Sequence, residues 1–187
     1  YEISECLVGS EMCIRDRSGI GLDPKRKEMG YRSSLTGILK TPNLKNLLDR
    51  RQRLCLPEQG QYAFVATKEA LEQAGIDQDY LKKNEVGILF GNDSCAEPVI
   101  KGADIIREQK STVMVGSGNI FQTMNSTITM NLSTIFNLKG INFTVSGACA
   151  SGSHAIGLGY LLIKQGLQDC IISVSYTHLT LPTNSRV

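Results

Sequence analysis

The strongest constraint on the fold of this chain is a set of short apolar runs separated by longer helical patterns. The runs lie at Val86–Phe90, 141–147 and 169–173, and each has the length of a single strand. The first contains no polar residue, as expected of a strand that is buried on both faces. Strands that alternate with helices predict an α/β fold with a mostly parallel sheet.

Four helices are predicted from apolar residues that recur three or four positions apart. They span 58–74, 97–109, 119–136 and 150–165. The third is rich in Ser, Thr and Asn, so we expect it to pack tightly against other parts of the protein rather than against solvent. The apolar side of the second helix is expected to consist of Val99, Ile100, Ala103, Ile105 and Ile106.

The two ends of the chain lack this patterning. Residues 1–17 and 174–187 show neither a helical nor a strand period, and they resemble peptides translated from sequencing-adapter DNA. We therefore predict non-native segments at 1–17 and 174–187 around a partial domain at 18–173. The alternative is that both ends are genuine but unusual termini. His178 lies in the last segment and is assigned no function.

The composition excludes several classes of function. The 187 residues carry a net charge of +2, which is too small to indicate a nucleic-acid partner. No apolar run approaches the length of a membrane span and no signal-peptide pattern is present, so we expect neither a membrane segment nor export. The six cysteines are dispersed without a CxxC pair, which favours reduced thiols in a cytoplasmic protein and argues against a bound metal.

One cysteine is distinguished by its surroundings. Cys149 lies in the stretch SGACASGSH (146–154), where the predicted strand 141–147 meets the predicted helix 150–165. The N–H groups and partial positive charge of a helix N-terminus stabilise a thiolate, and small neighbours leave room for a substrate. Cys149 is therefore a candidate nucleophile; the alternative is a small buried residue in a crowded turn. His154, five residues further on, is interpreted as a structural, hydrogen-bonded side chain rather than as the base.

The segment around Cys149, VSGACASGSHAIG, resembles the active-site segment of the elongating β-ketoacyl-acyl-carrier-protein synthases. Further segments match this family in the same order and at the same spacings, so the resemblance covers nearly all of residues 18–173. They include LLDRRQRLCLPEQGQYAFVATKEALEQAGI, EVGILFGN and NLKGINFTVSGACASGSHAIGLGY. The resemblance implies a thiolase-like fold, of which this chain would hold the N-terminal half, with incomplete αβα layers around a mixed sheet.

The resemblance also implies a catalytic role for Cys149 in the intact protein. Its thiol would accept an acyl chain from an acyl carrier protein, and the carbanion formed when malonyl-carrier protein loses CO₂ would attack that thioester. No bound cofactor is implied, because phosphopantetheine would arrive on the acyl carrier protein. In the family, two histidines and a lysine of the second half support this chemistry, and we expect none of them here. This chain alone is therefore predicted to have no condensing activity.

Further assignments follow from the same resemblance. The basic run Arg50, Arg51 and Arg53 lines up with a segment that contributes to carrier-protein docking; the alternative is a solvated basic turn. The helix 119–136 resembles one that borders the acyl pocket, so Phe121, Met124 and Ile128 are candidates to tune chain length, with ordinary core packing as the alternative. The strand INFTVS would pair with its own copy, which implies a homodimer for the intact protein.

Two other functions remain open at the level of sequence. One is a thiolase or an initiating synthase that uses coenzyme A thioesters. The other is a non-catalytic chain-length partner of an active synthase, although the cysteine at position 149 argues against it. The resemblance does not distinguish fatty acid synthesis from polyene or polyketide synthesis.

Overall fold

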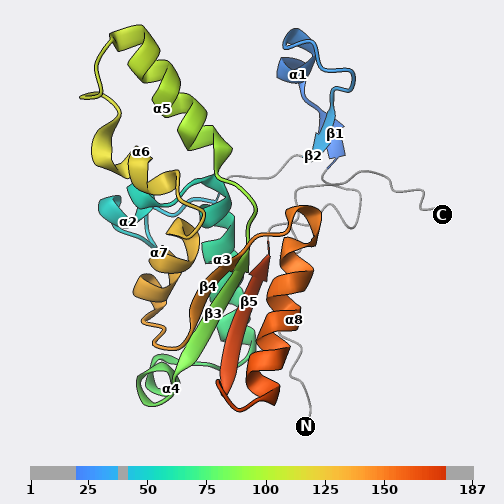
Figure 1. The fold of residues 1–187 in the computed structure, drawn as a ribbon, viewed down its shortest axis with the longest axis vertical. Helices are drawn as coiled ribbons and strands as arrows, with labels where there is room; N and C mark the ends of the chain where they lie inside the picture. Colours follow the sequence, from blue (N-terminus) through green and yellow to red (C-terminus); the bar gives the residue numbers. More distant parts are fainter. Residues whose placement is uncertain (1–19, 38–41, 176–187) are drawn as a thin grey trace, which may run out of the picture.

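The computed structural model describes residues 20–37 and 42–175. At its centre lies a sheet of three strands, β3 (Val86–Gly91), β4 (Asn142–Val145) and β5 (Cys170–Ser175), in the order β4-β3-β5. Both pairings are parallel, and all three strands lie where the apolar runs predicted them (Figure 1). The predicted α/β fold is thereby confirmed.

Helices cover both faces of this sheet (Figure 1). α8 (Ser151–Lys164) contacts all three strands on one face, whereas α3 (Glu58–Gln73) and α7 (Thr127–Phe136) lie against the other face. This layering agrees with the αβα arrangement that the resemblance implied. Within the described ranges, no helix is both long and apolar enough to cross a membrane. The remaining elements are β1 (Ile20–Leu22), α1 (Pro24–Glu28), β2 (Leu35–Gly37), α2 (Arg50–Cys55), α4 (Gln78–Lys83), α5 (Ala96–Gln109), α6 (Gly116–Gln122) and the 3₁₀ turn η2 (Ala148–Ala150).

The antiparallel pairing in the structure lies outside the central sheet. β1 and β2 pair antiparallel as a two-stranded ribbon, which Figure 1 shows apart from the three parallel strands. Within the part of the chain that the structure describes, the central sheet itself is therefore parallel throughout, and no described strand gives it a mixed character.

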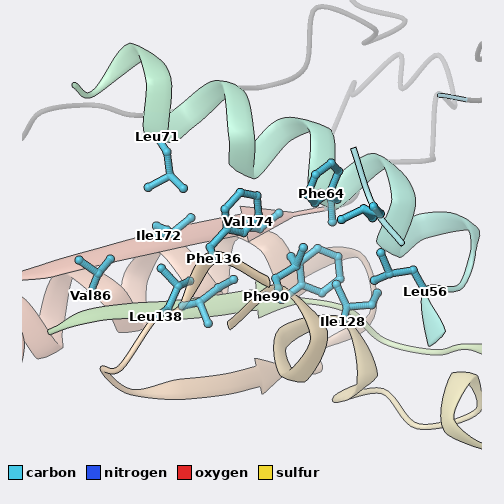
Figure 2. Packing of buried hydrophobic residues seen from close by; sticks show 14 of the residues in the cluster. Leu56, Phe64, Leu71, Val86, Phe90, Ile128, Phe136, Leu138, Ile172 and Val174 are labelled. Carbon is cyan, nitrogen blue, oxygen red and sulfur yellow. The ribbon is translucent and has the colours of Figure 1, made fainter. Parts of the chain in front are cut away.

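The hydrophobic core fills the space between the sheet and the layer of α3 and α7 (Figure 2). Val86, Ile88 and Phe90 of β3 are completely buried in this core. Above them, the ring of Phe64 from α3 stacks on the ring of Phe136 from α7, with centroids 5.3 Å apart. Because successive side chains of a strand point to opposite faces, alternate residues of β3 supply this core and the others face α8.

The opposite face of β3 lies very close to α8. A Cβ atom built on Gly91 would lie 2.5 Å from the backbone nitrogen of Gly152, which is closer than real Cβ atoms approach. One turn later Ala155 is fully buried, and a Cβ atom on Gly159 would lie 3.5 Å from Cδ1 of Leu89. Small residues on both elements thus allow the start of α8 to rest directly on the end of β3.

The predicted helix 119–136 is interrupted at 123–126, between α6 and α7, so the prediction of one continuous helix is wrong. At the break, the Asn125 side chain donates a hydrogen bond to a backbone carbonyl in the loop after β3 (2.8 Å), a contact that periodicity does not reveal. α7 does pack tightly, as its Ser and Thr content indicated. Thr129 is buried, and its hydroxyl lies 3.0 Å from the hydroxyl of Thr144 in β4.

The second predicted helix is confirmed as α5, but its apolar side does not face a core. Val99, Ile100 and Ile106 are 51%, 60% and 41% exposed. The reason is the position of the helix, which projects beyond the sheet and contacts α6 (Figure 1). Ala103 and Ile105 on the same side are half-buried, so the described part of the chain covers this side of α5 only in part.

Candidate active site

The carboxyl ends of two parallel strands form the candidate site. β3 and β4 run in the same direction, so both end at the same edge of the sheet. At this edge, the N–H of Asn92, directly after β3, donates to the carbonyl of Val145, the last residue of β4 (3.0 Å). Ligands of open parallel sheets bind at this edge, and the stretch 146–154 begins here.

Cys149 lies at the junction of strand and helix, as the sequence predicted. It is the middle residue of η2, which directly precedes α8, and its side chain is exposed with a free thiol. The first N–H groups of an α-helix have no partners within the helix and carry a partial positive charge. They can therefore stabilise a thiolate, or an oxyanion that forms beside it.

The turn before the thiol is strained and tightly hydrogen-bonded. Ala148 adopts a left-handed conformation (φ 48°), which costs an alanine about 1–2 kcal/mol. The buried hydroxyl of Ser151 accepts a hydrogen bond from the N–H of Gly147 (2.8 Å) and donates one to the carbonyl of Ala148 (2.7 Å). Within the turn, the N–H of Ala150 donates to the Gly147 carbonyl (3.0 Å).

A carboxylate from the loop after β3 also holds this turn. Oδ1 of Asp93 accepts hydrogen bonds from the Ser146 hydroxyl (2.6 Å) and from the N–H of Ala148 (3.0 Å). These two bonds, that of Ser146 first, hold the pKa of Asp93 below its ordinary value, against a small opposing effect of burial. Asp93 cannot be identified from the sequence, because a loop aspartate 53 residues before Ser146 gives no local signal of this contact.

Exposure separates Cys149 from the other described cysteines. Cys95 is buried, Cys55 and Cys170 are half-buried, and Cys149 alone of these four is exposed. Among the residues that the structure describes, no group of three His, Cys, Asp or Glu side chains could hold a metal ion. The site therefore offers a thiol for nucleophilic chemistry.

His154 lies beside the turn, next to Gly147. Its side chain is exposed, and a Cβ atom built on Gly147 would lie 2.6 Å from Nδ1 of His154. Among the described residues no partner donates to or accepts from the His154 side chain, and the hydrogen-bonded structural histidine stays a prediction. Only a glycine at position 147 leaves space for the imidazole in this arrangement.

The three arginines of the basic run lie on α2, and they differ in exposure. Arg50 and Arg51 are exposed, whereas Arg53 is half-buried and lines an open hollow together with Glu58 and Lys101. The mixed charges of that hollow compensate the charge of Arg53 in part. Arg50 and Arg51 therefore present the free positive charge of this helix.

The three candidate pocket residues do not share one environment. Phe121 at the end of α6 and Met124 in the following turn are 46% and 38% exposed. Ile128, by contrast, is fully buried in the hydrophobic core, where Figure 2 shows it close to Phe90. The structure thus brings Phe121 and Met124 to the surface and places Ile128 in the core packing that the sequence analysis named as the alternative.

The strand–turn–helix segment around Cys149 lies within a long match to one family model. Residues 15–186 match the model described as "Beta-ketoacyl synthase, N-terminal domain". The chain belongs to the β-ketoacyl synthase family. The match also runs into residues 174–187, which the sequence analysis set apart. The foreign origin of the two ends stays a prediction, and residues 1–17 and 176–187, His178 included, lie outside the described residues.

This β-ketoacyl synthase domain is similar to parts of longer enzymes. It is 30% identical over 159 residues to 3-oxoacyl-[acyl-carrier-protein] synthase 1 of Escherichia coli (strain K12). It is 33% identical over 158 residues to the protein of the same name from Buchnera aphidicola subsp. Schizaphis graminum. The alignments cover 84% and 83% of this chain but only 39% of each relative, so the chain spans about two fifths of their length.

Solved structures of ketosynthases share the fold. A β-ketoacyl synthase from Burkholderia phymatum STM815 is similar with a TM-score of 0.72 at 26% identity, over 88% of this chain and 41% of that one. A type II polyketide synthase acyl-carrier protein in complex with its ketosynthase gives a TM-score of 0.65 at 23% identity, over 77% of this chain and 41% of that one. At 23% identity, the similarity to the second structure shows a shared fold only. Together they establish the thiolase-like ketosynthase fold for this domain.

Proposed function

We propose that this domain belongs to a 3-oxoacyl-[acyl-carrier-protein] synthase in which Cys149 accepts the acyl chain. The observation that carries the proposal is the exposed free thiol of Cys149 at the N-terminus of α8, on the carboxyl edge of the sheet. The named relatives support this activity for a protein of their full length. Free, dispersed cysteines fit a cytoplasmic location.

The geometry of the site supports acyl transfer to Cys149. The sulfur of Cys149 attacks the carbonyl carbon of the acyl thioester, and a carbon–sulfur bond forms as the carbonyl oxygen becomes negative. The partial positive charge at the start of α8 stabilises that oxygen. When the oxyanion collapses, the bond to the phosphopantetheine sulfur breaks, and the released thiol takes the proton that Cys149 has lost. Phosphopantetheine thus arrives on the carrier and needs no resident site on this chain.

Condensation is expected to need residues that this chain does not contain. Its histidines are His154 and His178. His154 lies exposed beside Gly147, and His178 belongs to the end segment that was set apart. We therefore expect no release of labelled CO₂ from malonyl-carrier protein by the 187-residue chain, although Cys149 is acylated. Measurable release of CO₂ would contradict the expectation that the chain is acylated but does not condense.

Intact-mass spectrometry after incubation with an acyl-carrier thioester tests the proposal. One acyl group should be added to the wild-type chain and to the control Cys55→Ser, and none to Cys149→Ser. Faster acylation from an acyl-coenzyme A would favour a thiolase or an initiating synthase. A wild-type chain that takes no acyl group would contradict the proposal and favour a non-catalytic chain-length partner.

We further propose that Arg50 and Arg51 bind acidic groups of the acyl carrier protein. Both guanidinium groups are exposed, and paired charges across such a surface raise the association rate. Arg53 is a weaker candidate for binding the carrier, because the acidic Glu58 lines the same hollow.

A charge reversal tests the docking surface. Arg51→Glu should slow association with the carrier, and the difference from wild type should shrink as salt is raised. Lys83→Glu is the matched control, because Lys83 is exposed on α4 at the opposite, amino end of β3. Equal association rates for wild type and Arg51→Glu at low salt would contradict the role of α2.

We propose that Phe121 and Met124 border the acyl pocket. Ile128, in the hydrophobic core, affects the pocket through its packing. α7, which carries Ile128, follows Met124 after one short turn, so a change of packing around Ile128 reaches the exposed pair. If this is correct, Phe121→Ala should change the preferred acyl length in the acylation assay more than Val113→Ala, a control at an exposed residue before α6. Identical chain-length profiles would contradict it.

A homodimer through β4 is proposed for the intact protein. In the described sheet β4 is an edge strand, paired with β3 on one side, and its Phe143 is 50% exposed. Edge strands with free backbone groups pair readily with a second chain. Phe143→Lys should shift the intact protein from dimer to monomer in analytical ultracentrifugation, and a dimer of unchanged strength would contradict pairing through this strand.

A further inference from the structure

The geometry points to Asp93 as a positioning residue, which holds the strained turn that presents Cys149 for acyl transfer. This inference rests on the proposed function, because it concerns the same thiol. Asp93 makes no hydrogen bond to Cys149; its bonds go to Ser146 and Ala148, which precede Cys149 in the turn. Its role is therefore separate from that of the nucleophile.

One oxygen of Asp93 fixes both ends of the segment Ser146–Ala148. Oδ1 accepts from the Ser146 hydroxyl at 2.6 Å and from the Ala148 N–H at 3.0 Å. Short hydrogen bonds to an ionised carboxylate are stronger than those between neutral groups. These same bonds, that of Ser146 first, hold the pKa of Asp93 below its ordinary value.

The loop that carries Asp93 is itself held in place. The Asn125 side chain donates to the Asp93 backbone carbonyl (2.8 Å), and the preceding Asn92 is anchored to Val145 by its N–H (3.0 Å). The Asn92 side chain is buried and also approaches the backbone carbonyl of Asn125 (3.5 Å). Asp93 is thus a fixed support for the turn, although its own side chain is exposed.

The support matters because Ala148 is in a conformation that alanine disfavours. Its φ of 48° lies in the left-handed region, where a residue with a Cβ atom stays only if its surroundings hold it. The bond from the Ala148 N–H to Asp93 supplies part of that restraint. It also occupies this N–H, so the oxyanion of the acyl-transfer step must be stabilised by other groups at the start of α8.

Asp93→Ala in the full chain tests the inference through the rate of acylation of Cys149. The variant should lower the maximal acylation rate about tenfold, which corresponds to the cost of a left-handed alanine, and leave the half-saturating carrier concentration unchanged. Asp93→Asn retains an acceptor oxygen and should lose less. The control Asp104→Ala removes an exposed carboxylate of α5, paired with Arg107, and should acylate at the wild-type rate.

A second substitution distinguishes positioning from general damage. Glycine adopts a left-handed conformation without cost, so Ala148→Gly combined with Asp93→Ala should restore acylation to within about threefold of wild type. A merely structural loss would not be rescued in this way. Wild-type acylation by Asp93→Ala alone, or a double variant as slow as Asp93→Ala, would overturn the inference.

Amide hydrogen exchange tests the role of Asp93 independently of the proposed acylation of Cys149. If the wild-type chain takes no acyl group, the proposed function is contradicted, and the exchange rate of the Ala148 N–H decides the role of Asp93. That N–H should be protected in the wild type and in Asp104→Ala, and should exchange faster in Asp93→Ala. Equal exchange in all three chains would overturn the inference.

Discussion

The two faces of β3 are built from different residues and have different consequences. Toward α3 and α7 the strand carries large side chains, such as Ile88 and Phe90, which are fully buried in the hydrophobic core. Toward α8 it ends in Gly91, where a Cβ atom would lie 2.5 Å from the backbone of Gly152. The first face gains stability from buried apolar area. The second gives up side-chain contacts so that the helix carrying the thiol can approach the strand.

The largest expected effect on stability comes from the core face. Phe90→Ala removes a fully buried ring and should lower the free energy of unfolding by about 3–5 kcal/mol, as measured by urea denaturation. Phe121→Ala is the matched control, because that ring is 46% exposed on α6 and should cost much less. Similar losses for both variants would show that the core is not where the structure places it.

A change on the face of β3 toward α8 should cause a smaller loss of stability but a larger loss of Cys149 acylation. Gly91→Ala forces the backbone at the start of α8 to move, at a cost of about 1–3 kcal/mol. It should therefore slow acylation of Cys149 more strongly than the more destabilising Phe90→Ala, at a temperature where both variants are folded. Gly157→Ala is the control, since a Cβ atom there meets nothing within 4 Å. Wild-type acylation of the Gly91→Ala chain would contradict the claim that the face of β3 toward α8 positions the thiol.

The smallest effect is expected from the titration of Asp93. Hydrogen bonds from Ser146 and then Ala148 lower the pKa of Asp93 from its ordinary value of 3.8. Because the pKa is lower in the folded chain than in the unfolded one, the stabilisation is complete above 3.8 and is lost as the pH falls through the folded-state pKa. The amide-proton shift of Ala148 should titrate with a midpoint below 3.8 and should be flat in Asp93→Asn. A midpoint above 3.8 would contradict the hydrogen bonding of the turn.

The same contrast explains what could be predicted from the sequence. The strands and α3 follow from local patterning, and the position of Cys149 between β4 and α8 follows from the small residues around it. The break near Asn125 and the role of Asp93 depend on contacts between distant segments, with Ser146 lying 53 residues beyond Asp93. The exposure of the apolar side of α5 could not be predicted for a related reason. Periodicity identifies a side that can be buried, and the packing of neighbouring elements decides whether it is.

The central claim is that the turn after β4 presents Cys149 as the acyl acceptor. Peptide mapping of the chain after a short exposure to an acyl-carrier thioester tests it most directly, because it compares all six cysteines of one molecule. The account predicts the acyl group on Cys149, with the buried Cys95 unmodified. Acylation of Cys95 at a comparable rate, or of neither, would contradict it.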